Sequence, residues 1–470
     1  MSHPPDIEST VCVIGGGPAG ATLATRLAML GHDVCLVERA VFPRRHLGES
    51  LTPGVLPLLE ATGVRAAVER AGFPTAPRVD VMWDDGLQTR LDPREEGLLV
   101  DRGAFDLLLL QRAADLGVRV LQPAQPVGWV QDEAGWLIRV VTPDVEQVVR
   151  AALLAEATGR SRMRASSRRL TAPRTLALSA YWRGPGLPDT PRIEAGRHGW
   201  FWRVPLPGGV CNTLAFVDPD HLRANPGLSL NAHLDALLAE TELLADANGL
   251  ERDGHVQAVD ATPFLNEAAV DATSVAVGDA AMSLDPLSSS GVQKAIQTAL
   301  AGAVVANTLV RRPSSAALAH QFYGDSLRDA STRHHQWAAS HYARMADIYA
   351  TPFWQRRAAD AVPDAETPAA PPSRPPADAL LRRAADTAFG LRPTLDADFV
   401  VEREVVTHPA LAEPLAFLGG VHVAPALRAL DSPLTRRDIV RRWQTLMPPA
   451  TATAIVDWLV TRGVVVEDRG

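Results

Sequence analysis

Residues 11–38 read VCVIGGGPAGATLATRLAMLGHDVCLVE. The first four are apolar and predict a buried parallel strand, residues 21–30 have helical periodicity, and residues 33–37 predict a second strand that ends at Glu38. A G-x-G-x-x-G pattern between strand and helix, with an acid 18 residues after the last glycine, is typical of a dinucleotide-binding βαβ unit. The alternative is a glycine-rich turn in an unrelated βαβ unit.

The three glycines of the pattern and the acid after it each have an expected physical role in nucleotide binding. Gly15 allows the tight turn, Gly17 lets a pyrophosphate approach the backbone, and Gly20 lets helix and strand pack closely. Glu38 can accept hydrogen bonds from both hydroxyls of an adenosine ribose. This part of the candidate cofactor site comprises Gly15, Gly17, Pro18, Ala19, Gly20, Glu38 and Arg39.

Residues 277–295 read VGDAAMSLDPLSSSGVQKA. They predict the end of a strand, a tight loop and a helix that opens near Gly291. Asp279, directly after Gly278, can hold a ribitol or ribose hydroxyl. The N–H groups and partial positive charge at the helix start suit an isoalloxazine ring, which becomes anionic on reduction. Pro286 and Val292 complete the candidate flavin-binding residues of this loop.

Lys294 is the only lysine among the 46 Lys and Arg residues of the chain. A chain that has Arg at every other cationic position indicates that Arg cannot replace Lys here. We therefore expect Lys294 to act electrostatically on the flavin or on its oxygen adduct. Ser289 and Ser290 of the same loop are further catalytic candidates. The alternative is that Lys294 survives by chance on the surface.

Three more segments supply cofactor-site candidates. Residues 44–50 read RRHLGES and lie in a loop before a helix; one arginine would lie near a phosphate, unless the loop is simply solvated. Arg102 precedes a helix at 107–115 and can meet pyrophosphate or adenine. The strand at 151–157 ends at Gly159, which lets the chain turn under the nucleotide. The candidates in the first of these segments are Arg45, Gly48, Glu49 and Ser50.

Composition argues against several classes of protein. The 470 residues carry a net charge of −8, which speaks against a broad nucleic-acid-binding surface. No apolar run is long enough to span a bilayer, and the N-terminus has no signal-peptide pattern. The three cysteines form no CxxC pair and the histidines at 334, 335 and 341 lack metal-site spacing. We therefore expect a cytoplasmic protein without a metal site.

The ordered motifs resemble those of a known family. GGGPAG, Glu38, GES, Arg102, ATG and GDA…DP…SSG resemble the flavoprotein monooxygenases of the para-hydroxybenzoate hydroxylase type. Two motifs are closer to the flavin-dependent halogenase branch. WFWRVP at 200–205 is similar to W-x-W-x-I-P, with Val for Ile, and DPLSSSGV at 285–292 to D-P-x-x-S-S-G-V.

The resemblance covers roughly residues 8–350 and implies non-covalent FAD. It assigns Glu38 to the ribose, Arg102 and the first glycines to the pyrophosphate, Asp279 to the ribitol, and the backbone around Gly291 to the flavin edge. The electrons would come from NAD(P)H, either directly or through a flavin reductase. No second nucleotide fingerprint follows, so a separate NAD(P)H domain of the usual kind is not expected.

The predicted fold is α/β: a Rossmann-like FAD-binding domain with an inserted, mainly antiparallel β substrate domain and a small C-terminal winged-helix-like α domain. We expect helices at 421–430, 435–446 and 450–461 and a closing strand at 464–467 in the last of these. Peptide binding, DNA binding and a plain structural cap are its alternative roles. The expected boundaries are 1–75, 98–165 and 265–315 for the FAD part, 76–97 and 166–264 for the substrate part, 316–350 for covering helices, 351–378 for a Pro- and Ala-rich linker, and 379–470 for the C-terminal domain.

One departure from the halogenase pattern decides the expected chemistry. Halogenases place a lysine in the N-terminal half to carry or orient hypohalous acid, and this chain has none before Lys294. The resemblance then implies oxygen transfer: reduced FAD adds O₂ to give a C4a-hydroperoxide, whose distal oxygen attacks an electron-rich aromatic ring. A smaller group similar to the halogenases also lacks this lysine and hydroxylates a peptidyl tryptophan during tryptophylquinone biogenesis.

We therefore expect an FAD monooxygenase that hydroxylates a tryptophan within a protein or peptide, which the C-terminal domain helps to hold. Trp182, Trp200 and Trp202 of the middle sheet offer apolar walls for such a ring, and each can equally be ordinary core. Two alternatives stay open. One is a hydroxylase or halogenase of a free or carrier-bound aromatic metabolite; the other is a flavin-binding assembly factor without turnover.

Overall fold

The computed structural model describes residues 5–44, 49–76, 78–91, 97–161, 163, 167–244, 249–361, 375–376 and 378–468. The chain divides into two units, Met1–Val362 and Pro363–Gly470. Among the helices in these described ranges, none combines the length and the apolar character that crossing a membrane requires.

The nucleotide-binding sheet grows from the predicted strand–glycine–helix segment. β1 (Ile7–Ile14) leads into α1 (Pro18–Met29), and β2 (Val34–Val37) lies parallel to β1, which confirms the prediction. The strand order is β8-β2-β1-β11-β10-β9, and β19 also pairs with β11. The further strands are β8 (Arg119–Leu121), β9 (Gln125–Asp132), β10 (Gly135–Val141), β11 (Glu146–Glu156) and β19 (Ser274–Ala276).

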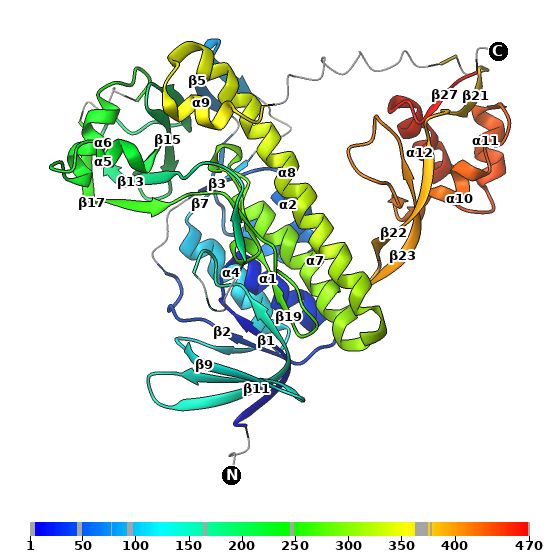
Figure 1. Ribbon diagram of the computed structural model, residues 1–470, viewed down its shortest axis with the longest axis horizontal. Helices are drawn as coiled ribbons and strands as arrows, with labels where there is room; N and C mark the ends of the chain where they lie inside the picture. Colours follow the sequence, from blue (N-terminus) through cyan, green and yellow to red (C-terminus); the bar gives the residue numbers. More distant parts are fainter. Residues whose placement is uncertain are drawn as a thin grey trace. The chain divides into compact units, whose positions relative to one another are not determined.

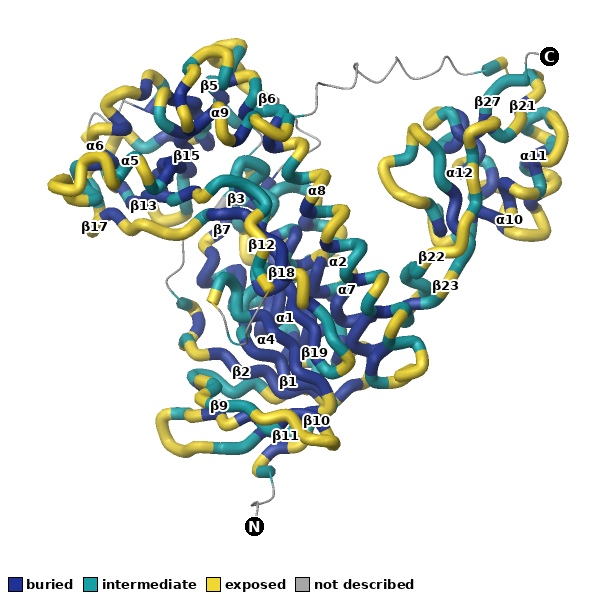
Figure 2. Tube along the Cα trace, viewed as in Figure 1, coloured by how far each residue is buried: buried dark blue, intermediate teal, exposed yellow. Residues whose placement is uncertain are grey.

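Burial explains why this sheet forms the centre of the first unit. Residues of β1 and β2 alternate between two faces, and Cys12, Ile14, Cys35 and Val37 join one apolar cluster with β10 and β11. On the helical side, α1 packs against both α4 (Arg102–Asp115) and α7 (Gly291–Arg311). Figure 2 shows β1, α1 and β19 as mostly buried segments.

Shorter elements surround the sheet. α2 (Val55–Thr62) packs on α7 and on α3 (Arg65–Arg70). Two three-stranded sheets have the orders β3-β7-β4 and β12-β18-β20. Their strands are β3 (Glu49–Leu51), β4 (Thr75–Ala76), β7 (Gly97–Val100), β12 (Arg168–Leu170), β18 (Phe264–Asn266) and β20 (Met282–Ser283).

A second seven-stranded sheet, called the middle sheet because most of its strands come from the middle of the sequence, has the order β17-β13-β16-β15-β14-β5-β6. Adjacent strands in this sheet are antiparallel, except that β14 and β5 are parallel to each other. One face packs against α6 (Leu230–Leu238), and the other packs against α8 (Ala316–Tyr349) and α9 (Pro352–Ala358). Its strands are β5 (Arg78–Trp83), β6 (Gly86–Leu91), β13 (Leu176–Arg183), β14 (Arg192–Gly196), β15 (Gly199–Leu206), β16 (Val210–Val217) and β17 (Glu251–Asp260). The first unit also contains α5 (Pro219–Arg223) and a short 3₁₀ turn, η3 (Pro313–Ser315).

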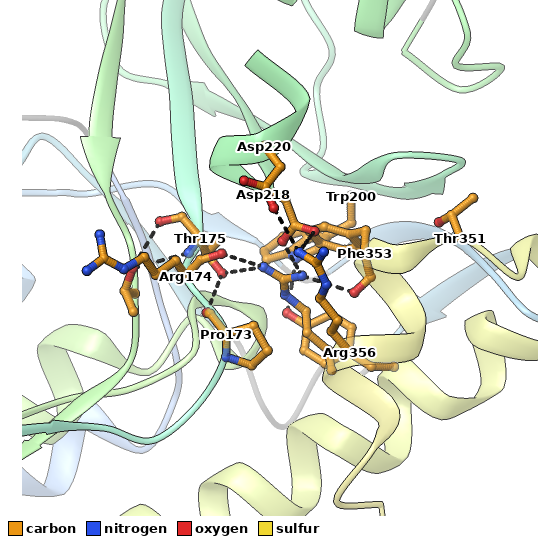
Figure 3. A network of polar contacts seen from close by, with 12 residues as sticks. Pro173, Arg174, Thr175, Trp200, Asp218, Asp220, Thr351, Phe353 and Arg356 are labelled. Carbon is orange, nitrogen blue, oxygen red and sulfur yellow. Dashed lines mark hydrogen bonds and ion pairs between the residues drawn. The ribbon is translucent and has the colours of Figure 1, made fainter. Parts of the chain in front are cut away.

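The first residues of the expected linker, 351–378, form helix α9, so that boundary was wrong. Trp354 is fully buried, and its indole N–H donates to the carbonyl oxygen of Gly196 at 3.0 Å. Arg357, also buried, donates to Asp218 at 2.7 Å. Figure 3 shows Asp218 in a polar network near Arg356 and Asp220. Because these contacts tie α9 to the middle sheet, this helix belongs to the first unit.

The second unit has a core of its own, which includes Trp443, Ile455 and Val456. Three helices were predicted here and three lie close to the expected places: α10 (Val423–Arg428), α11 (Arg436–Trp443) and α12 (Pro449–Thr461). They accompany the sheet β26-β21-β27 in a winged-helix-like arrangement (Figure 1). The strands of the unit are β21 (Leu380–Arg383), β22 (Ala388–Asp396), β23 (Phe399–Thr407), β24 (Phe417–Leu418), β25 (Val421–His422), β26 (Leu434–Thr435) and β27 (Val465–Glu467).

Candidate flavin site

The predicted cofactor residues converge on one edge of the nucleotide-binding sheet. Gly15 follows β1, Glu38 follows β2, Gly159 lies just beyond β11, and Gly278 follows β19. These four strands are mutually parallel where they pair, so their carboxyl ends meet at the same edge. Ligands of open α/β sheets bind outside that edge.

The glycine loop is shaped by close backbone approach. Gly15 has a φ of +108°, and a Cβ there would collide with the carbonyl oxygen of Ala157. A Cβ at Gly20 would collide with the carbonyl oxygen of Gly15. Pro18 and Ala19 begin α1, and no described side chain caps its N-terminus. Its first backbone N–H groups are therefore available to a phosphate.

Glu38 is buried, and its carboxylate is fixed by the backbone on both sides. One oxygen accepts from the Gly16 N–H at 2.6 Å and the other from the Ala40 N–H at 2.7 Å. Each carboxylate oxygen can accept a second hydrogen bond, which leaves capacity for ribose hydroxyls. Arg39, the next residue, is exposed.

Two arginines share one buried carboxylate beside the glycine loop. Arg102 is buried at the start of α4 and donates to Asp106 at 2.9 and 3.1 Å. Arg44 donates to the same Asp106 at 2.9 Å, and its guanidinium would lie 3.1 Å from a Cβ at Gly17. Shared acceptance by Asp106 fixes both cations where a pyrophosphate could be bound.

The structure describes only some of the sequence candidates around this pair of arginines. Arg45 and Gly48 lie outside the described residues, and the same holds for the side chain of Glu49. Ser50 lies in β3, where it pairs with Leu99 of β7. Sequence reasoning missed Asp106. Its signal is the spacing of four residues from Arg102, which places both on one face of a helix.

Lys294, the only lysine of the chain, lies in the first turn of α7 and is buried against the loop after β19. The Lys294 side chain is 4% exposed; its ammonium pairs with Asp279 and donates to the carbonyl oxygen of Met282 at 2.6 Å. Gly278 donates its N–H to Thr298 Oγ1 at 2.9 Å, which fixes the short 3₁₀ turn η1 (Gly278–Ala280) against α7. The surface alternative for Lys294 is therefore wrong.

Electrostatics keep Asp279 ionised. Burial favours the neutral acid, but the Lys294 ammonium, with Arg160 and Arg102, lowers the pKa of the Asp279 carboxyl below its ordinary 3.8. Arg160 was not predicted, although it directly follows Gly159. It donates to the carbonyl oxygen of Thr262 at 2.7 Å and contacts the Ser283 hydroxyl.

The loop continues into an N-terminus that no described side chain caps. Asp285 accepts from the Leu287 N–H at 3.0 Å and starts the 3₁₀ turn η2 (Pro286–Ser288). Ser289 has a φ of +50°, and the hydroxyl of Ser290 bonds that of Ser288 at 2.6 Å. α7 begins at Gly291 and buries Val292. Its first N–H groups can therefore serve an anionic ring edge.

The three tryptophans expected at the substrate do not share a face of the middle sheet. Trp200 and Trp202 belong to the apolar cluster against α8 and α9, whereas Trp182 belongs to the cluster against α6. Trp200 is fully buried and stacks on Phe216 with ring centroids 3.9 Å apart. The structure thus gives Trp200 a core position, and one pocket wall formed by all three is excluded.

Three of the histidines of α8, those at 334, 335 and 341, have three different partners. His334 contacts the carbonyl oxygen of Asp285 at 3.1 Å, His335 the carboxylate of Asp360 at 3.0 Å, and His341 the carbonyl oxygen of Trp337 at 2.9 Å. Within the described ranges, no group of three or more His, Cys, Asp or Glu residues is arranged to hold a metal ion.

The donors fit a flavin dinucleotide. The uncapped start of α1 and the two arginines beside it can contact phosphates, the buried acid after β2 can contact a ribose, and the uncapped start of α7 can contact a ring edge. Fold and site together define a flavin-dependent oxidoreductase of the α/β class.

Comparison with known proteins makes this class specific. Residues 10–73 and 78–369 match the family described as tryptophan halogenase, and the chain belongs to that family. A tryptophan 2-halogenase from Chondromyces crocatus is 29% identical over 345 residues, which cover 67% of this chain and 64% of that protein. The chain thus spans less than two thirds of the length of this relative.

Two solved structures resemble nearly the whole chain. QhpG, described as a peptidyl tryptophan dihydroxylase essential for tryptophylquinone cofactor biogenesis, is 29% identical with a TM-score of 0.73, over 97% of this chain and 99% of QhpG. CmlS, a flavin-dependent halogenase, has a TM-score of 0.78 at 21% identity, over 99% of this chain and 97% of CmlS. At that identity CmlS supports the fold alone.

Proposed function

We propose that this protein is an FAD-dependent monooxygenase that hydroxylates a tryptophan within a protein or peptide, as a step in building a tryptophylquinone cofactor of the cysteine tryptophylquinone type. Bound FAD, once reduced, would supply the activation of O₂ for attack on an electron-rich ring. The reductant is NAD(P)H, directly or through a reductase.

The observation that favours oxygen transfer is that the Lys294 amine is buried and already has partners. Transfer of a halogen in this family pattern needs a lysine amine that meets hypohalous acid, and this chain has a single lysine. That amine is buried and already pairs with Asp279 and Met282. Since no second lysine exists, oxygen transfer is favoured over halogen transfer.

The chain's own residues would bind and orient the cofactor. Glu38 would accept from the adenosine ribose, and Arg44 and Arg102 would neutralise the pyrophosphate. Asp279, kept ionised by Lys294, would accept from the ribitol. The open N-terminus of α7 would stabilise negative charge on the reduced ring.

Two observations favour a protein substrate. QhpG, whose description names a peptidyl tryptophan, is similar over 97% of this chain, including the second unit. That second unit has its own apolar core. The first unit would therefore not need it for stability, and catalysis on a small molecule would not need it either. A tethered docking unit raises the local concentration of a protein substrate to roughly millimolar.

The test is isotope-resolved mass spectrometry. The enzyme is incubated with FAD, a reducing system, chloride, bromide, ¹⁸O₂ and a Trp- and Cys-containing candidate subunit. We expect one or two labelled oxygen atoms on a tryptophan. A halogen isotope pattern would refute oxygen transfer. Label on free indole at the same rate as on the subunit would refute the peptidyl substrate, and no turnover at all would favour the assembly factor.

The role of the second unit has a separate test. A chain that lacks residues 379–470 should retain FAD but label the subunit more slowly at limiting subunit concentration, and the difference should vanish at saturation. Equal labelling by both chains at limiting subunit would show that this unit does not dock the substrate.

A further inference from the structure

A buried hydrogen-bond chain joins the middle sheet to the loop before α7. The indole N–H of Trp200, in β15, donates to the hydroxyl of Tyr342, in α8, at 3.2 Å. That hydroxyl donates to Asp285 Oδ1 at 2.8 Å. The same carboxylate oxygen accepts from the Leu287 N–H at 3.0 Å, inside the loop.

Water hardly reaches this chain of contacts. Trp200, Tyr342 and Asp285 are 2%, 2% and 4% exposed. Burial and the nearby Asp285 charge raise the pKa of Tyr342 well above its ordinary value, so the hydroxyl keeps its proton and can donate it. Polar contacts that are fully satisfied and dry tend to define one arrangement of the groups they join.

The loop before α7, at which this series of hydrogen bonds ends, needs such support. Ser289 adopts a left-handed conformation with a φ of +50°, which a residue with a side chain adopts only when its surroundings impose it. Asp285 holds the start of this turn through Leu287, and His334, also in α8, contacts the Asp285 carbonyl oxygen at 3.1 Å. The loop geometry is therefore imposed largely from α8.

We propose that Trp200 and Tyr342 are positioning residues for the flavin loop. Trp200, the first residue of WFWRVP, orients the Tyr342 hydroxyl. Tyr342 orients Asp285, and Asp285 sets residues 286–291 so that the N-terminus of α7 faces the cofactor. This inference goes beyond the proposed reaction and holds whichever ring the enzyme modifies.

The experiment removes the hydrogen-bonding groups of Tyr342 and Trp200 and follows the loop before α7. Tyr342→Phe deletes the hydroxyl, and Trp200→Phe deletes the indole N–H. Hydrogen exchange of peptides that cover residues 286–293, FAD dissociation and the visible flavin spectrum are measured. We expect exchange in the loop and loss of FAD to rise about tenfold in Tyr342→Phe, the size of a lost bond to a charged group, and the bound spectrum to shift.

Two matched variants separate positioning from general stability. Tyr323→Phe removes another buried hydroxyl of α8, which donates to the carbonyl oxygen of Ala276 at 2.8 Å. Trp354→Phe removes another buried indole N–H. Both should lower the unfolding midpoint as the test variants do while leaving loop exchange and flavin spectrum unchanged. Equal effects in all four variants would overturn the proposal.

Asp285 offers a rescue test that preserves the fold. Asp285→Asn keeps an oxygen that can accept from Leu287 and Tyr342, whereas Asp285→Ala keeps none. The loop should exchange nearly as slowly in Asp285→Asn as in the natural chain and fast in Asp285→Ala. Slow exchange in both Asp285→Ala and Tyr342→Phe would refute the relay.

Discussion

Replacing Lys294 by Met should destabilise the fold by about 1–3 kcal/mol at neutral pH. Breaking a fully buried ion pair costs about 3–5 kcal/mol, and breaking an exposed pair costs about 1 kcal/mol or less. Lys294 is 4% exposed, but Asp279 is 34% exposed, so solvent screens part of the loss. Met keeps the apolar stem in place, which isolates the effect of the ammonium.

The sign of the pH dependence follows from the direction of the shift. Lys294 lowers the folded-state pKa of Asp279, so this carboxylate stabilises the fold above its unfolded value near 3.8. The contribution is lost as the pH falls through the lowered folded value. The difference between the natural chain and Lys294→Met should therefore be largest near pH 7 and shrink below about pH 4.

Urea unfolding without FAD, followed by tryptophan fluorescence at pH 7 and again well below pH 4, measures both quantities. Arg65→Met is the control, because Arg65 pairs with Glu69 at 2.8 Å on the exposed surface, where solvent screening leaves an ion pair little effect on stability. A loss in Lys294→Met no larger than in Arg65→Met, or a loss that stays the same at both pH values, would refute the assigned pair.

Three further predictions concern the cofactor. Lys294→Met should lower the flavin reduction potential and slow hydroxylation, because a positive charge near the anionic reduced ring is lost; a normal potential and turnover would leave Lys294 a structural role only. Asp279→Ala should weaken FAD binding by about 1.5–3 kcal/mol, the value of a bond to a charged group, and unchanged FAD retention would contradict it. Acid precipitation should release all yellow colour from the protein; colour that stays with the pellet would contradict non-covalent binding.

The cofactor edge was predictable because its signals are local. Residues 11–38 contain a strand, a turn and a helix start at fixed spacing, and residues 277–295 contain the turn and the helix start that follow β19. Parallel strands bring their ends together without further information. The sequence candidate for a phosphate contact was Arg45, which lies outside the described residues. The contact of Arg44 with Asp106, 62 residues away, could not be predicted from local signals.

Contacts between distant elements explain the other differences. Tyr342 contacts Asp285, which is 57 residues away, and Trp200, which is 142 residues away. The periodicity of a single segment does not predict such contacts. Trp200 and Trp202 are two residues apart in β15, so their common face follows from the strand period. Trp182 lies in β13, and its opposite face depends on a register that the sequence alone does not give.

The position of Trp200 separates family membership from reaction type. WFWRVP is among the motifs most similar to the halogenase pattern, yet its first tryptophan lies in the core and donates to a tyrosine that holds the flavin loop. A motif that supports the loop is needed by any enzyme with this flavin site, whether it transfers oxygen or halogen. The element that would distinguish the two reactions is a lysine amine able to meet an oxidised halide. Here the single lysine is buried against Asp279, so the shared motifs and the missing lysine are consistent with one account: a common flavin scaffold used for hydroxylation.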